Sequence, residues 1–295
     1  MDLFGPFTIR GVVNKRTRNK CFGIIFTCGG SRAVYCDVTQ DYSTDSFLQA
    51  VRRFVSLRGY PSDIYSDCGS QLVKAEKEIR NHKIMQYGVE KGLTWHFSTP
   101  TAPWKNGCAE SLIKSIKKAL TVTIGNQILS FPELQTYVFE AANIVNERPI
   151  AVHSTSLDDG SYICPNDLLL GRASTAVPSG PFPEYTSPKK RLAFIQLLVD
   201  SFWKKWVRDY FPSLLIRSKW HTEKRSLCVG DIVLIQDLSA LRGQWKLGKV
   251  SKIHTSVDNV IRNVDVQYKN DSSRKLVTVS RPVQRLVVIL PEESS

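Results

Sequence analysis

Three strand-like segments come before the first helix-forming segment of this chain. They cover Asp2–Phe7, Cys21–Cys28 and Arg32–Val38, and they are rich in the β-branched and aromatic residues that favour strands. Basic and glycine-containing loops separate them, so we expect a three-stranded antiparallel meander. We expect Gly5-Pro6 to close the first of these strands.

Helices and strands then alternate. The expected elements are a helix capped at Ser43 and ending near Arg58, a strand Asp63–Ser66, a helix near Gln71–Arg80, a strand Thr94–Phe97, and helices Glu110–Leu120 and Pro132–Asn146. Strands followed by alternating helices and strands predict a mixed α/β sheet with flanking helices.

The second half of the chain has a different character. Residues 151–188 are rich in serine, proline and glycine and are expected to form a connector. A long amphipathic helix is predicted from Arg191 to about Arg217, and its interleaved Lys204, Lys205 and Arg208 leave room for a nucleic-acid contact. From Val229 to Leu290 the pattern is all β, with about five strands.

Positive charge is concentrated in the same half. The chain carries a net charge of +13; residues 1–188 hold 20 Lys and Arg against 17 Asp and Glu, whereas residues 189–290 hold 20 against 8. Such a segment indicates a polyanionic partner, most simply nucleic acid. A solvated basic surface is the plainer alternative.

The cysteines argue against a disulfide framework. There are seven, an odd number, and no Cys-Xaa-Xaa-Cys pair occurs, so we expect reduced thiols in an intracellular protein and no zinc site. No signal peptide is visible and no apolar run has the length of a membrane span, so no membrane partner is expected.

Three acidic residues stand at element boundaries. Asp2 begins the first strand, Asp67 follows the strand ending at Ser66, and Glu110 opens a helix. A fold that gathers them would create a carboxylate cluster. Carboxylates at close quarters repel one another, and Mg²⁺ or Mn²⁺, which prefer oxygen ligands, relieve that repulsion. Taken singly, an Asp before a glycine is more often a turn residue than a ligand.

With these motifs the chain resembles the integrases of BEL/Pao retrotransposons from Asp2 to about Leu290. The matching segments are Ser66-Asp67-Cys68-Gly69, Trp95–Pro100, Ala102–Glu110, Asn146-Glu147-Arg148-Pro149, and the Gly-Asp-Xaa-Val-Leu and Trp-Xaa-Xaa-Gly-Xaa-Val patterns near the end. The resemblance implies a ribonuclease H-like catalytic core over residues 1–150, a connector over 151–188, the amphipathic helix over 189–218, and a small five-stranded, barrel-like, DNA-binding domain over 219–291.

The resemblance also implies an activity. Asp2, Asp67 and Glu110 would bind two Mg²⁺ or Mn²⁺ ions and join the 3′ ends of element DNA to target DNA, without a covalent enzyme intermediate. A homo-oligomer acting on DNA in the nucleus is implied in the same way. The expected DNA contacts are Lys114, Lys117, Lys118, Arg262, Lys269, Lys275, Arg281 and Arg285.

The lysines of the Glu110 helix also follow from spacing. Glu110, Lys114, Lys117 and Lys118 stand at i, i+4, i+7 and i+8, on one helix face, where they could hold DNA phosphates. An ion pair within the helix between Glu110 and Lys114 is the alternative. His96 could steer DNA or water, or could pack at a strand end.

Two departures leave catalysis open. The chain starts at the first acid, so we expect a clipped first strand that positions Asp2 poorly, and Cys68 stands where relatives usually carry an asparagine. An active integrase, a catalytically decayed or host-adopted DNA-binding protein, and a chromatin or protein interaction module all remain open. Strong salt dependence of binding would separate the DNA binders from the interaction module.

Overall fold

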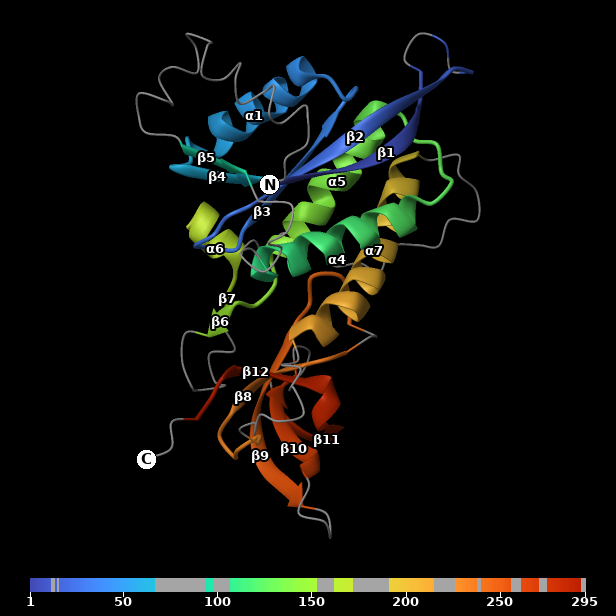
Figure 1. Cartoon of the computed structure of the whole chain (residues 1–295). Helices are drawn as coiled ribbons and strands as arrows, with labels where there is room; N and C mark the ends of the chain where they lie inside the picture. The colour runs from blue at the N-terminus through green and yellow to red at the C-terminus, as the bar shows by residue number, and fades with distance from the viewer. Residues whose placement is uncertain are drawn as a thin grey trace. The chain divides into compact units, whose positions relative to one another are not determined.

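The structure is a computed structural model. It describes residues 1–11, 14, 16–66, 94–97, 107–152, 162–171, 191–214, 226–237, 240–255, 261–270 and 275–292, with the backbone alone at 107–110 and 191–192. The chain divides into two compact units, one of Met1–Asn143 with Glu184–Phe202 and one of Ile144–Pro183 with Trp203–Ser295. Figure 1 shows the elements of both.

The first unit opens with the predicted antiparallel meander. It comprises β1 (Asp2–Arg10), β2 (Arg18–Thr27) and β3 (Val34–Thr39), in the order β1-β2-β3. Gly5-Pro6 does not close the first strand, contrary to the prediction. Instead, the pairing with β2 shifts register between Phe4 and Phe7, and Gly5 takes a φ of 115° that favours glycine. The irregularity is a bulge within one longer strand.

One face of this unit is closed by α1 (Thr44–Arg58). Its start is capped as predicted, because the Ser43 side chain accepts a hydrogen bond from the Ser46 N–H at 3.2 Å. Phe47 and Val51 on this helix pack with Ile24 of β2 and with the strands described next. Because α1 covers one face of the sheet through these apolar contacts, the opposite face turns away from α1.

The parallel pair β4 (Asp63–Ser66) and β5 (Thr94–Phe97) lies in the same core. Ile64 and Trp95 are register partners and both are buried against α1. The Trp95 indole N–H donates to the Ser66 hydroxyl at 2.9 Å, which satisfies two buried polar groups at the end of β4. Figure 1 shows α1 beside this strand pair.

Two long helices follow the strand pair in the chain. α4 (Gly107–Ile124) contacts β1 and β2, and α5 (Phe131–Asn146) follows it. The buried residues Leu112, Ile116 and Leu120 recur every four residues along α4, so this helix is amphipathic as predicted. The loop between the helices is tied to the far end of β1, because the Arg10 N–H donates to the Leu129 carbonyl at 2.8 Å.

The second unit contains a short docked turn. It consists of β6 (Ala151–Val152), paired with β7 (Tyr162–Ile163), and α6 (Pro165–Leu170). Glu147 is buried and accepts a hydrogen bond from the Asn166 amide, while the Asp167 carboxylate caps the Cys164 N–H at 2.7 Å. The first bond fastens the turn to Glu147, which follows α5, and the second caps the start of α6.

The C-terminal part is an antiparallel sheet beside the end of α7 (Arg191–Leu214). Its strands are β8 (Ile232–Ile235), β9 (Lys246–Thr255), β10 (Ile261–Lys269), β11 (Leu276–Pro282) and β12 (Leu286–Leu290). The five predicted strands are present, but they form an open sheet in the order β11-β10-β9-β8-β12 and not a closed barrel. The short 3₁₀ turn Val283–Arg285 joins the two edge strands, which lie at opposite sides of the sheet.

Both faces of β8 are covered, which explains why all four of its residues are buried. Val233 and Ile235 belong to one apolar core, whereas Leu234 packs with Phe211 of α7 and Val287 of β12 on the other face. None of the described helices is both long and apolar enough to span a membrane.

Candidate active site

Asp2 lies on the face of β1 that turns away from α1. Its neighbours Met1 and Leu3 both pack against the α1-side core, and side chains alternate between the two faces of a strand. Asp2 therefore points to the α4 side, where its side chain is about one-third exposed. The first predicted acid is held in a paired strand, because Asp2 is the register partner of Ile25 on β2.

Lys117 reaches Asp2 from α4. Its Nζ lies 2.7 Å from Asp2 Oδ2 and donates a second hydrogen bond to the Leu3 carbonyl oxygen at 3.0 Å. The lysine side chain is 28% exposed, so the pair is partly shielded from water. This ion pair does not test the prediction that Lys117 binds DNA. It shows that the face of α4 that carries Lys117 turns toward Asp2.

Glu110 belongs to the first turn of this helix, and its side chain lies outside the described part. Seven residues separate it from Lys117 in sequence, about 10 Å along the axis. Helical side chains lean toward the N-terminus of the helix, so Lys117 reaches back in the direction of Glu110. The other two predicted lysines, Lys114 and Lys118, are exposed on the same helix.

The end of β4 lies next to the start of β1. The Met1 backbone nitrogen donates to the Tyr65 carbonyl oxygen at 2.6 Å, which links the first strand to the fourth. Asp67 falls outside the described residues. It follows Ser66 directly in the chain, so one peptide unit separates it from the last residue of β4.

The outward side of β4 and β5 carries an aromatic pair of which the sequence analysis singled out only His96. Tyr65 and His96 are register partners, and their rings stack with centroids 4.6 Å apart and planes 14° apart. His96 Nε2 also lies 2.8 Å from Asp63 Oδ1, and this hydrogen bond from His96 lowers the pKa of the Asp63 carboxyl. His96 is thus a surface group, and the alternating exposure of β4 is the signal that could have found Tyr65.

The five basic residues predicted in the C-terminal sheet do not share one face. Arg281 is the register partner of Val264, which is buried, whereas Arg285 is exposed in the 3₁₀ turn. Lys269 pairs with Leu276 at the end of the β10–β11 hairpin, Lys275 directly precedes β11, and Arg262 lies at a register irregularity of β10. Lys269 and Arg281 therefore lie on opposite faces of this hairpin.

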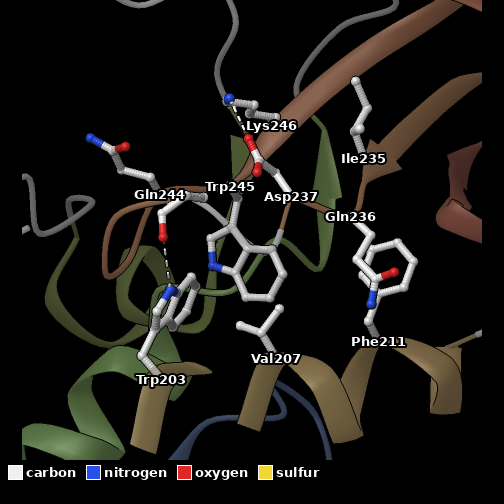
Figure 2. Close-up of a pocket in the computed structure, with 10 residues that line it drawn as sticks. Trp203, Val207, Phe211, Ile235, Gln236, Asp237, Gln244, Trp245 and Lys246 are labelled. Carbon is white, nitrogen blue, oxygen red and sulfur yellow. Dashed lines mark hydrogen bonds and ion pairs between the residues drawn. The ribbon is translucent and has the colours of Figure 1, made fainter. Parts of the chain in front are cut away.

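A small pocket in the second unit offers no ligand site. Figure 2 shows Trp203, Trp245 and Phe211 among the residues that line it, with the Trp203 indole N–H donating to the Ala240 carbonyl at 3.4 Å. Trp203 and Trp245 meet edge to face at 5.1 Å. The remaining space holds little more than one water molecule. The aromatic residues therefore fill this region as core.

The described residues contain no group of three or more His, Cys, Asp and Glu side chains that could hold a metal ion. Of the three predicted ligands, only Asp2 has a described side chain. The predicted donor set consists of carboxylate oxygens alone, which suits Mg²⁺ or Mn²⁺.

Residues 190–289 match the model of a family described as a family of unknown function (DUF5641), about a third of the chain. No curated protein matches. A solved chain in the structure titled "CryoEM structure of simian T-cell lymphotropic virus intasome in complex with PP2A regulatory subunit B56 gamma" resembles this one with a TM-score of 0.36 and 11% sequence identity, covering 98% of this chain and 78% of that chain. A likeness of this size carries no argument about the present chain.

Proposed function

We propose that this chain is an integrase-type protein that binds DNA ends and joins them to target DNA at Asp2, Asp67 and Glu110. The observation that supports this most is the contact of Lys117 with Asp2. It orients the Glu110-bearing helix α4 toward the first acid, and the Met1–Tyr65 hydrogen bond brings the end of β4 to the same strand. In this proposal the three carboxylates meet on the α4 side of the sheet.

The carboxylates would bind two Mg²⁺ or Mn²⁺ ions, which supply activation of the attacking hydroxyl or water and stabilise the leaving 3′-oxygen. Asp2 would be held in place by β2 pairing and by the bulge at Gly5. Asp67 would continue β4 by one residue, and Glu110 would present its carboxylate from the first turn of α4. No serine or tyrosine nucleophile is required, since water or a DNA hydroxyl attacks the phosphodiester directly.

DNA would be held by the lysine face of α4. Lys114 and Lys118 are exposed there, and Lys117 could leave Asp2 for a phosphate once metal ions neutralise the carboxylate. The basic second unit would add contacts that do not depend on sequence. Assembly as a homo-oligomer on paired DNA ends, in the nucleus, belongs to the same proposal.

A second candidate, a DNA-binding protein without catalysis, is favoured by one observation. The Asp2 carboxylate is already neutralised by Lys117, which also holds the Leu3 carbonyl. If this pair persists in the presence of Mg²⁺, Asp2 is a structural acid and the chain binds DNA without cutting it.

A strand-transfer assay separates the two candidates. The protein is incubated with Mn²⁺ and a labelled duplex carrying element-end sequence, beside Asp67→Asn, Glu110→Gln and, as a control outside the site, Asp45→Asn. We expect joined products from the wild type and the control and none from the other two. Salt-sensitive DNA binding without product from any version would instead support the non-catalytic candidate, and absence of DNA binding would refute both.

A further inference from the structure

We propose that Tyr65 and His96 form a stacking platform for an unpaired nucleobase at the DNA end. The inference rests on the proposed function and names a subsite of it. The observation behind the inference is an aromatic pair at the surface. The two rings contact each other, yet 51% of Tyr65 is exposed to solvent. A tyrosine that served only as core would be buried.

The pair is built by the sheet and not by chance contact of mobile side chains. Tyr65 and His96 stand opposite one another in the parallel ladder, and their rings stack at 4.6 Å. The contact between His96 Nε2 and Asp63, at 2.8 Å, fixes the plane of the imidazole. Each ring uses one face for the other ring, so the platform presents a rigid aromatic surface to an incoming group.

The platform faces the proposed reaction site. Ile64 and Trp95 point into the α1-side core, so Tyr65 and His96 point to the opposite side, as Asp2 does. The Tyr65 carbonyl accepts the Met1 N–H, one residue from Asp2. Tyr65 also precedes Asp67 by two positions in the sequence.

The aromatic rings and nearby lysines of this surface favour a nucleobase over a protein as its ligand. The outer face of a ring in this stack can take one nucleobase, and aromatic stacking accepts any base because every base has a π face. The same side of the sheet carries the lysines of α4, which suit the phosphates on either side of such a base.

The test measures binding and stacking without catalysis, in buffer that contains EDTA. The probes are a blunt duplex and the same duplex with a short 3′ overhang that carries 2-aminopurine, each labelled with fluorescein at the distant end. The variants are Tyr65→Ala, Tyr65→Phe as the conservative replacement, and Tyr42→Ala as a control, since Tyr42 is 50% exposed and contacts the Phe22 ring at a tilt of 45° elsewhere on the unit.

We expect Tyr65→Ala to weaken binding of the overhang duplex by about 5- to 100-fold and to leave the blunt duplex unchanged. The 2-aminopurine fluorescence should be quenched by the wild type, by Tyr65→Phe and by Tyr42→Ala, but not by Tyr65→Ala. If Tyr65→Ala fails to fold by circular dichroism, His96→Ala takes its place.

Equal overhang affinity and equal quenching for the wild type and Tyr65→Ala would overturn the platform and leave the proposed function standing. Weakening of both duplexes to the same extent would also overturn it, because the side chain would then act on duplex DNA in general. If the wild type binds neither duplex, the proposed function fails and the platform fails with it.

Discussion

Replacing Lys117 by methionine tests the contact that joins the first acid to α4. The change keeps most of the apolar stem and removes two hydrogen bonds, to Asp2 Oδ2 and to the Leu3 carbonyl. Hydrogen bonds to charged groups contribute about 1.5–3 kcal/mol when buried, and exposed ion pairs about 0–1 kcal/mol. With side-chain exposures of 28% and 34%, the pair lies between these limits.

We therefore expect Lys117→Met to lower the local free energy of unfolding of β1 by about 2 kcal/mol, of which about 1 kcal/mol is coupling with Asp2. The two units need not unfold together, so the assay is amide hydrogen exchange of the β1 segment, measured by mass spectrometry. The expected acceleration is about 30-fold for Lys117→Met and about 5-fold for Asp2→Asn.

The double variant isolates the pair. If the contact exists in solution, Asp2→Asn should add almost nothing once Lys117 has been replaced. The matched control is Lys114→Met, an exposed lysine on the same helix, which should change exchange of β1 by less than about twofold. A coupling below about 0.3 kcal/mol would refute the reasoning, because the two single changes would then be independent.

Two further predictions concern titrating groups. Burial acts to raise the pKa of the exposed Cys28 thiol, but hydrogen bonds from Ser31 and Gly30 and the charge of Arg32 together lower the pKa overall. Burial raises the pKa of Cys21 to about 12. Iodoacetamide at pH 8 should therefore alkylate Cys28 before Cys21 and leave Cys21 unmodified until the protein unfolds, as peptide mass spectrometry would record; early labelling of Cys21 would contradict this. The hydrogen bond from His254 lowers the pKa of Asp265, so its stabilising contribution is present above the unfolded pKa of about 4 and is lost as the pH falls through the lower folded value. In His254→Ala the Asp265 carboxyl should titrate at higher pH by carbon-detected NMR, and an unchanged midpoint would argue against the contact.

Much of the secondary structure could be predicted because its causes are local. The Ser43 cap, the amphipathic spacing of α4 and the β-branched strands each act within a few residues, and each appears where the sequence indicated it. The open C-terminal sheet was less predictable. Closure of a barrel depends on how edge strands meet, which single-strand patterns do not encode.

The site contacts were harder to predict because they join distant parts of the chain. Lys117 meets Asp2 across more than a hundred residues, so helical spacing could place the lysine on a face but could not name its partner. Tyr65 and His96 come together only through the parallel register of β4 and β5. The sequence of one strand does not show which residue of the neighbouring strand lies beside its exposed side chains.

The bulge at Gly5 gives the two halves of β1 separate anchors. Ahead of it, Met1 and Asp2 are held by β4 and α4; beyond it, Arg10 is held by the Leu129 carbonyl. In an unbroken strand, a slip of one residue at either end would turn every side chain to the opposite face. Here the one extra residue of the bulge can absorb such a slip, so changes in the loop near Leu129 need not turn Asp2 away from α4. The first carboxylate is insulated from shifts at the far end of its own strand.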